Sequence, residues 1–176
     1  MNKKILKAMA CTGLSFALLA VPVSPVALTN TNGIMTESVQ AATVSKKYVM
    51  TVDSTFQNIA LSYSNSSIAT VKKNSSTKYT ISNVKSGTTT VTATSGNVTY
   101  KTNVKVTVDS KGYVTLTFKG SSNMSIKSSN SNVFKVTTTK NSDGSKTFKI
   151  VTKGTGTANL KLTMGSMSTT VKYTVS

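Results

Sequence analysis

Lysine and serine are the reactive side chains that this sequence supplies in quantity, whereas groups that move protons are scarce. Histidine is absent, Cys11 and Glu37 are the only residues of their kinds, and the three aspartates are Asp53, Asp109 and Asp143. A Ser-His-Asp triad needs a histidine, and carboxylate-pair catalysis needs two acids that face one substrate bond. A Ser-Lys dyad is compatible with the composition, but no motif marks one. We therefore predict that the protein is not an enzyme and has no catalytic residues.

The aspartates also set the expectation for metals and cofactors. Calcium sites usually gather several carboxylates in one loop, and Asp53, Asp109 and Asp143 are widely separated in the sequence. Asp53 and Asp109 stand at the ends of expected strands, within matching Thr-Val-Asp-Ser tetrapeptides, and Asp143 stands in an expected turn. We predict no metal site and no cofactor.

The N-terminal segment 1–41 has the pattern of a secretory signal peptide. Three lysines precede an apolar run from Ala8 to Ala20, which is shorter than the roughly 20 apolar residues of a membrane-spanning helix. Val39 and Ala41 are small residues at the spacing that a signal peptidase requires. We expect cleavage after Ala41, secretion, and no integral membrane segment afterwards. No sorting motif follows, so any association with the cell wall is expected to be non-covalent.

After Ala41 the chain is strongly cationic. Eighteen lysines against three aspartates give a net charge of +15, and arginine is absent. Solubility needs a net charge of about 2 to 8 in a small domain, and the excess favours polyanions. Arginine is the residue that forks onto phosphates and guanine edges. We expect anionic cell-wall or matrix polymers as partners and no sequence-specific nucleic acid, while another secreted or surface protein stays open as a partner.

Alternating apolar and polar residues predict that these lysines stand on β-strands. From Val98 to Val108 the even positions are mostly apolar, and the odd positions include Lys101 and Lys105. Threonine, serine and valine dominate, which disfavours helix. Short strands separated by turn residues are typical of an antiparallel sandwich. Asp143-Gly144 predicts a tight hairpin between two of them, because this pair tolerates positive φ angles.

Five lysines occupy outward positions of the expected strands and are the candidate polyanion-facing residues: Lys101, Lys105, Lys149, Lys161 and Lys172. Two interpretations stay open for them. Lysines on strands keep a β-rich chain soluble and discourage pairing between sheet edges. The size of the charge excess favours a binding role in addition.

An internal repeat predicts the domain organisation. The segment 64–71, Ser-Asn-Ser-Ser-Ile-Ala-Thr-Val, is matched by Ser-Asn-Ser-Asn-Val-Phe-Lys-Val at 129–136. Further along, Gly87 matches Gly156, and the wider spacing of this pair shows that the second copy has gained four residues. We predict a signal peptide at 1–41 and two β-sandwich modules at 42–109 and 110–176. Because such modules have small cores, packing or strand sharing between them is expected.

The repeated segments resemble the bacterial immunoglobulin-like domains of group 2. Those domains carry a serine/asparagine stretch before a Val-Ala-Thr-Val-like strand, and later a Val-x-x-Gly-x-x-x-Val-x-Ala segment, which residues 84–93 match. The resemblance covers residues 46–176 and is closer in the first copy, since the second departs at Phe134-Lys135. It implies tandem immunoglobulin-like antiparallel β-sandwiches, of the kind found in adhesins, surface-layer and cell-wall proteins, and as spacers in secreted enzymes.

Two hypotheses about function follow. The first is a secreted, non-enzymatic adhesion module on the cell surface or in the extracellular matrix, which binds anionic polymers through its cationic surface. The second is a structural subunit that assembles into a fibre or matrix through the exposed edges of its sheets.

Overall fold

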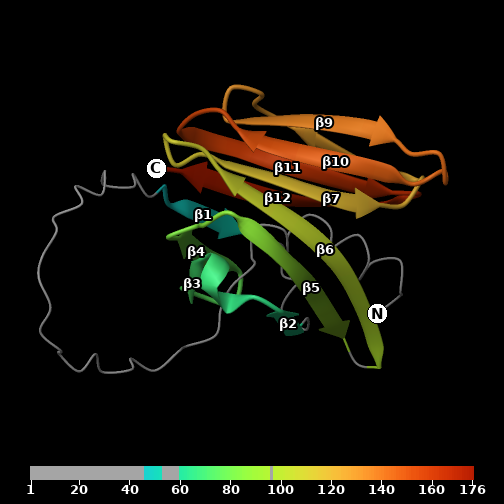
Figure 1. The fold of residues 1–176 in the computed structure, drawn as a ribbon, viewed down its shortest axis with the longest axis horizontal. Helices are drawn as coiled ribbons and strands as arrows, with labels where there is room; N and C mark the ends of the chain where they lie inside the picture. Colours follow the sequence, from blue (N-terminus) through green and yellow to red (C-terminus); the bar gives the residue numbers. More distant parts are fainter. Residues whose placement is uncertain (1–45, 53–59, 96) are drawn as a thin grey trace, which may run out of the picture.

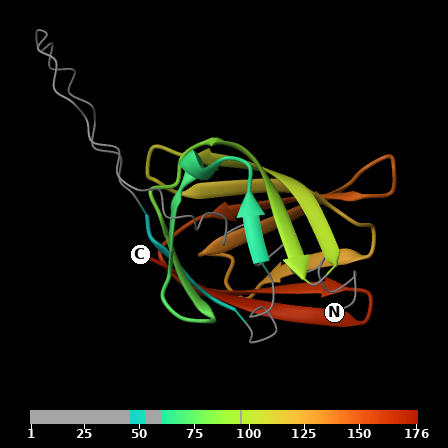
Figure 2. The same cartoon turned by 90° about the horizontal axis from the view of Figure 1, so that it is seen from below.

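Two antiparallel β-sheets make up the fold in the computed structural model, which describes residues 46–52, 60–95 and 97–176. The predicted signal peptide, its cleavage site and Asp53 lie outside these residues. Sheet A has the order β3-β4-β1-β12-β11-β8, and sheet B has the order β2-β5-β6-β7-β10-β9. The two sheets form the layers of a sandwich (Figures 1 and 2). The prediction of an all-β antiparallel sandwich is therefore confirmed.

The strands of sheet A are β1 (Tyr48–Thr51), β3 (Thr70–Lys73), β4 (Lys78–Ser82), β8 (Met124–Ser128), β11 (Gly156–Met164) and β12 (Met167–Val175). Those of sheet B are β2 (Ala60–Tyr63), β5 (Gly87–Ser95), β6 (Val98–Val108), β7 (Val114–Gly120), β9 (Phe134–Lys140) and β10 (Lys146–Thr152). One 3-10 turn, η2 (Ser66–Ile68), precedes β3.

The predicted alternation determines which side chains are buried. In β11, Leu160 and Leu162 are fully buried, whereas Lys161 between them is exposed. The inward residues of both sheets form a single core cluster. Aromatic contacts join its parts: the Phe118 and Phe148 rings are 5.7 Å apart within sheet B, and the Phe134 ring meets the Tyr173 ring across the layers at 5.6 Å.

The two halves of the chain contribute equally to both sheets. Strands β1 to β6 correspond in order to β7 to β12, and each half supplies three strands to each sheet. The halves join at two equivalent seams, where β1 pairs with β12 and β7 pairs with β6. This pairing is the strand sharing that short modules lead one to expect. The division between residues 109 and 110 stays a prediction, and both sheets run continuously through it.

The repeated serine/asparagine segment forms the same local structure in both halves. Asn65 Oδ1 accepts a hydrogen bond from the amide of Ser67 at 3.2 Å, and Asn130 Oδ1 accepts one from the amide of Asn132 at 3.0 Å. Each segment then buries one aliphatic side chain, Ile68 or Val133. These asparagines compete with the ladder for backbone amides and so start each segment with a turn.

A glycine lies against each of these buried side chains. A Cβ atom on Gly87 would lie 3.0 Å from Ile68 Cδ1, and one on Gly156 would lie 3.3 Å from Val133 Cγ2. The repeated Gly/aliphatic pair explains why the sequence keeps a glycine at the equivalent place in both copies.

The four extra residues of the second half lengthen one hairpin. In the first half β3 and β4 have four and five residues, whereas the corresponding β9 and β10 have seven each. The hairpin loop is closed by hydrogen bonds from the amide of Asn141 to Ser145 O at 2.9 Å and from the amide of Gly144 to Asn141 O at 3.1 Å. Gly144 has a φ of 77°. The hairpin that Asp143-Gly144 predicts is therefore present.

Candidate polyanion-binding surface

The structure exposes all five candidate lysines but divides them between two opposite surfaces. Lys101, Lys105 and Lys149 lie on the outer face of sheet B, and Lys161 and Lys172 lie on the outer face of sheet A. The five residues therefore do not form one patch. Each sheet presents its own set of lysines.

On sheet B, two candidate lysines share one row across the sheet. Lys105 of β6 and Lys149 of β10 both lie opposite Thr117 of β7. Two strand spacings separate them, so their Cα atoms are about 10 Å apart. Thr88 and Thr137 continue the row on its two sides. This surface offers separated ammonium groups with hydroxyl groups between them.

The charge of one further lysine on sheet B, Lys119, is already paired with an acid. The Lys119 ammonium donates to Asp143 Oδ2 at 2.5 Å, and both side chains are more than half exposed. Asp143 Oδ1 also accepts from the hydroxyl and the amide of Ser145. Together these partners, Lys119 above all, hold the pKa of Asp143 below its usual range. The hydrogen-bond partners of Asp143 thus lie in and beside the hairpin turn.

The other described acidic side chain, that of Asp109, also belongs to a turn. Asp109 Oδ1 accepts from the amides of Lys111 at 2.9 Å and Tyr113 at 2.8 Å, which closes the connection between β6 and β7. Within the described residues no group of three acids, histidines or cysteines is close enough to hold a metal ion. The described part of the chain also contains no helix of the length and apolar character that crossing a membrane requires.

Sheet A brings together lysines that are far apart in sequence. Lys127 of β8 lies directly opposite Lys161 of β11. On the next strand Lys172 of β12 lies opposite Asn159, which places it diagonally from Lys161. We define the sheet A lysine face as the exposed outer-face residues Lys72, Lys78, Lys127, Lys161 and Lys172.

The Lys127–Lys161 pair is electrostatically unfavourable in the free protein. Pairs along an antiparallel ladder alternate between hydrogen-bonded and non-hydrogen-bonded positions. The amide of Ser129 donates to Asn159 O, and the amide of Gly165 donates to Asn123 O, so odd-numbered pairs of this ladder are the hydrogen-bonded ones. The two lysines fall at a hydrogen-bonded position, where Cα atoms lie about 5.5 Å apart. Like charges directly opposite each other on a sheet are destabilising. The two described acidic side chains, Asp109 and Asp143, lie in turns of sheet B, so neither supplies a counter-charge to this pair.

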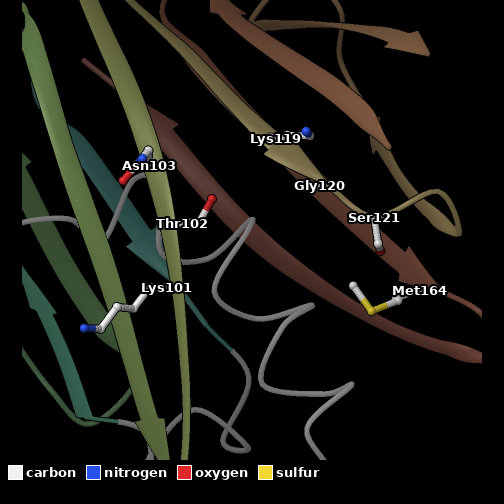
Figure 3. Close-up of a pocket in the computed structure, with 7 residues that line it drawn as sticks. All are labelled: Lys101, Thr102, Asn103, Lys119, Gly120, Ser121 and Met164. Atoms are coloured by element: carbon white, nitrogen blue, oxygen red, sulfur yellow. The ribbon is translucent and has the colours of Figure 1, made fainter. Parts of the chain in front are cut away.

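An open pocket of about 400 Å³ lies where β6 separates from β7. The ladder between these strands ends at Val104 and Phe118, and Lys101, Ser121 and Met164 are among the lining residues (Figure 3). The hydroxyl of Ser121 donates to Asn123 Oδ1 at 2.8 Å, and the other lining lysine, Lys119, is paired with Asp143. The pocket therefore shows no hydrogen bond of a Ser-Lys dyad.

Sequence patterns alone did not identify Lys72, Lys78 and Lys127 as members of one face. Lys127 lies within an alternating stretch, Met124, Ile126 and Ser128, that is too short to be distinctive. Its position opposite Lys161 depends on the pairing of β8 with β11. Only the register of the assembled sheet provides that information.

Comparisons with known proteins leave the family open. No family model matches the chain, and no curated protein matches it. Membership of the group 2 bacterial immunoglobulin-like domains therefore stays a prediction.

Among the solved structures that align with the chain are S-layer proteins. Domains 5-6 of the S-layer protein SbsC align with 21% identity over 65% of this chain and 78% of theirs, with a TM-score of 0.25. The S-layer protein rSbsC(31-844) aligns with 17% identity over 65% of this chain and a TM-score of 0.24. This chain spans only 19% of that protein. At such TM-scores the function of the chain must be argued from its own geometry.

Proposed function

We propose that the protein is a secreted, non-enzymatic binding module that attaches to anionic polymers of the cell wall or matrix through lysine-covered sheet faces. The observation that carries the proposal is the sheet A lysine face, with five exposed lysines and no acidic side chain among the described residues of its strands. A polymer with repeating phosphate or carboxylate groups supplies the counter-charges that the fold omits.

The geometry favours an extended ligand over a small one. The lysines spread over five of the six strands of sheet A, from Lys72 on β3 to Lys127 on β8. Each ammonium group is a point charge on a flexible stem and does not impose the planar geometry of a guanidinium group. Such a surface selects for charge density along a chain and tolerates variation in its chemical repeat. Bound anions also relieve the repulsion between Lys127 and Lys161.

The proposal is tested by salt titration of the full chain on immobilised polyphosphate and, in parallel, on immobilised polygalacturonate. Retention is expected to fall steeply between about 50 mM and 1 M NaCl, because counterion release and screening govern such contacts. The two matrices show whether phosphate or carboxylate polymers bind more tightly. Retention that does not change with salt on either matrix contradicts the proposal.

Two variants that lose the same charge test whether the polymer binds at the sheet A lysine face. The triple variant Lys127→Gln, Lys161→Gln, Lys172→Gln is expected to reduce the log–log salt slope by about 2 to 3, since each ionic contact contributes about one. The control replaces three exposed loop lysines by glutamine and removes the same charge: Lys85, Lys111 and Lys153. Its slope is expected to fall by less than about 1. Equal losses in the two variants would assign binding to net charge and not to sheet A.

A further inference from the structure

The outer edge of β9 differs from the other sheet edges in length and in its residues. Strand β9 is the last strand of sheet B and has β10 as its ladder partner in the described structure (Figure 1). It has seven residues, whereas the edge strands β2, β3 and β8 have four, four and five. Exposed edges of this kind are templates for pairing with another strand.

The repeat shows what protects the equivalent edge in the first half. When segment 64–71 is aligned with segment 129–136, Lys72 and Lys73 of β3 correspond to Thr137 and Thr138 of β9. Lysines on an edge strand discourage edge-to-edge pairing. The second half therefore lacks charge at these two central positions, and the lysines of β9, Lys135 and Lys140, lie near its ends. The hairpin insertion has lengthened the same strand.

Hydrogen bonds at the two ends of β9 show which of its backbone groups face outward. The amide of Lys153 donates to Val133 O at 2.8 Å, and the amide of Asn141 donates to Ser145 O at 2.9 Å. Because partners alternate along an antiparallel ladder, odd-numbered residues of β9 bond to β10. The amide and carbonyl groups of Val136, Thr138 and Lys140 consequently point away from it.

We propose that this edge pairs antiparallel with the same edge of a second copy of the chain, about a two-fold axis at Thr138. The outward groups at 136, 138 and 140 are symmetric about Thr138, whereas the amide of Phe134 already donates to Asn130 O. In this register Val136 faces Lys140 of the second copy, and Thr138 faces Thr138. The joined edges exchange about six backbone hydrogen bonds.

The charges on β9 are compatible with this register. No lysine faces a lysine, because Lys135 falls opposite Asn141 of the second copy, two residues before the hairpin acid Asp143. The central pairs are threonines, and cross-strand threonine pairs are favourable in sheets. The two sheets B then form one continuous sheet across the dimer. This association goes beyond the proposed polymer binding and does not depend on it.

Cysteine cross-linking tests the register in the full chain with Cys11→Ser as background. Thr138→Cys is expected to form a disulfide-linked dimer under mild oxidation, because Cα atoms at the two-fold position are about 5.5 Å apart, within reach of a disulfide. Thr137→Cys is the matched control, since it is also exposed. In the proposed register position 137 faces Thr139, and its own copy is a diagonal neighbour about 7–8 Å away. Equal cross-linking at both positions, or none at 138, overturns the proposal.

Sedimentation of the full chain without cysteine substitutions gives a second measurement. The wild-type chain is expected to dimerise at micromolar concentrations, and Thr138→Lys, which introduces the residue of the first half, is expected to be monomeric. The variant is expected to fold, because the side chain at 138 is exposed. Circular dichroism checks its folding. Salt separates this proposal from polymer binding: screening strengthens association of two cationic copies but weakens retention on a polyanion. A wild-type chain that stays monomeric at all concentrations and salts contradicts the dimer.

Discussion

Tyr48 joins the two sheets through a single buried hydroxyl group. Its side chain is fully buried, and its hydroxyl oxygen accepts a hydrogen bond from the amide of Val114 at 3.1 Å. Tyr48 begins β1 in sheet A, and Val114 begins β7 in sheet B. Burial raises the pKa of Tyr48 above its usual value, so the hydroxyl stays neutral to a more alkaline pH than that of a free tyrosine.

Replacing Tyr48 by phenylalanine is expected to destabilise the protein by about 1–3 kcal/mol, because the buried amide of Val114 loses its acceptor. The free energy of unfolding in urea measures the effect. Tyr113→Phe is the control at the corresponding position of the repeat. Tyr113 is half-buried, and its ring keeps the contact with the Lys46 ammonium, 5.2 Å from the ring centre, after the substitution. Similar losses for both variants would contradict a special role for the Tyr48 hydroxyl.

At the scale of elements, the β9–β10 hairpin shows how a short insertion changes an edge. Asn141 bonds across the loop through its side chain, with Nδ2 donating to Ser145 Oγ at 2.8 Å and Oδ1 accepting from Thr147 Oγ1 at 3.1 Å. Gly144 supplies the left-handed backbone position that closes the loop. The loop thus holds two seven-residue strands in register, and these carry the edge that we propose for dimerisation.

Gly144→Ala is expected to destabilise the protein by about 1–2 kcal/mol, because an alanine in the left-handed region places Cβ against the backbone. Outside residues 143–145, a Cβ atom at this position meets no atom within 4 Å, so the loss is conformational. Gly144→Asn is expected to lose less, since asparagine adopts this conformation more readily. Thermal unfolding of both variants measures the difference. Equal melting temperatures for Ala and Asn would contradict this account.

At the scale of the whole molecule, the two halves share both sheets and one core. Strand β1 pairs with β12, β6 pairs with β7, and the core cluster contains residues from both halves. Neither half can lose its strands without exposing the apolar face of the other. The fold therefore links the stability of the two repeats, although the repeat in the sequence marks two units.

We expect one cooperative unfolding transition, with equal calorimetric and van't Hoff enthalpies. Val91→Ala in the first half and Leu160→Ala in the second, both at fully buried positions, are each expected to shift the whole transition to lower temperature, because each leaves a core cavity. Differential scanning calorimetry measures both variants. Two resolved transitions, of which each variant shifts only one, would show independent modules.

The sequence by itself determined the all-β class, the outward position of the lysines and the β9–β10 hairpin, because these depend on local patterns. Alternation with period two specifies which side of a strand is buried, and Asp143-Gly144 specifies a turn. The internal repeat predicted two tandem modules, and that division stays a prediction.

Only the tertiary structure decided which strands are neighbours. The alternating pattern predicts that Lys127 and Lys161 face outward. It does not predict that β8 pairs with β11, which is what places the two lysines opposite each other. The same holds for β1 and β12, which lie near the two ends of the described chain and pair directly. Pairing depends on how both halves close one shared core, which is a property of the assembled sheets and not of any segment.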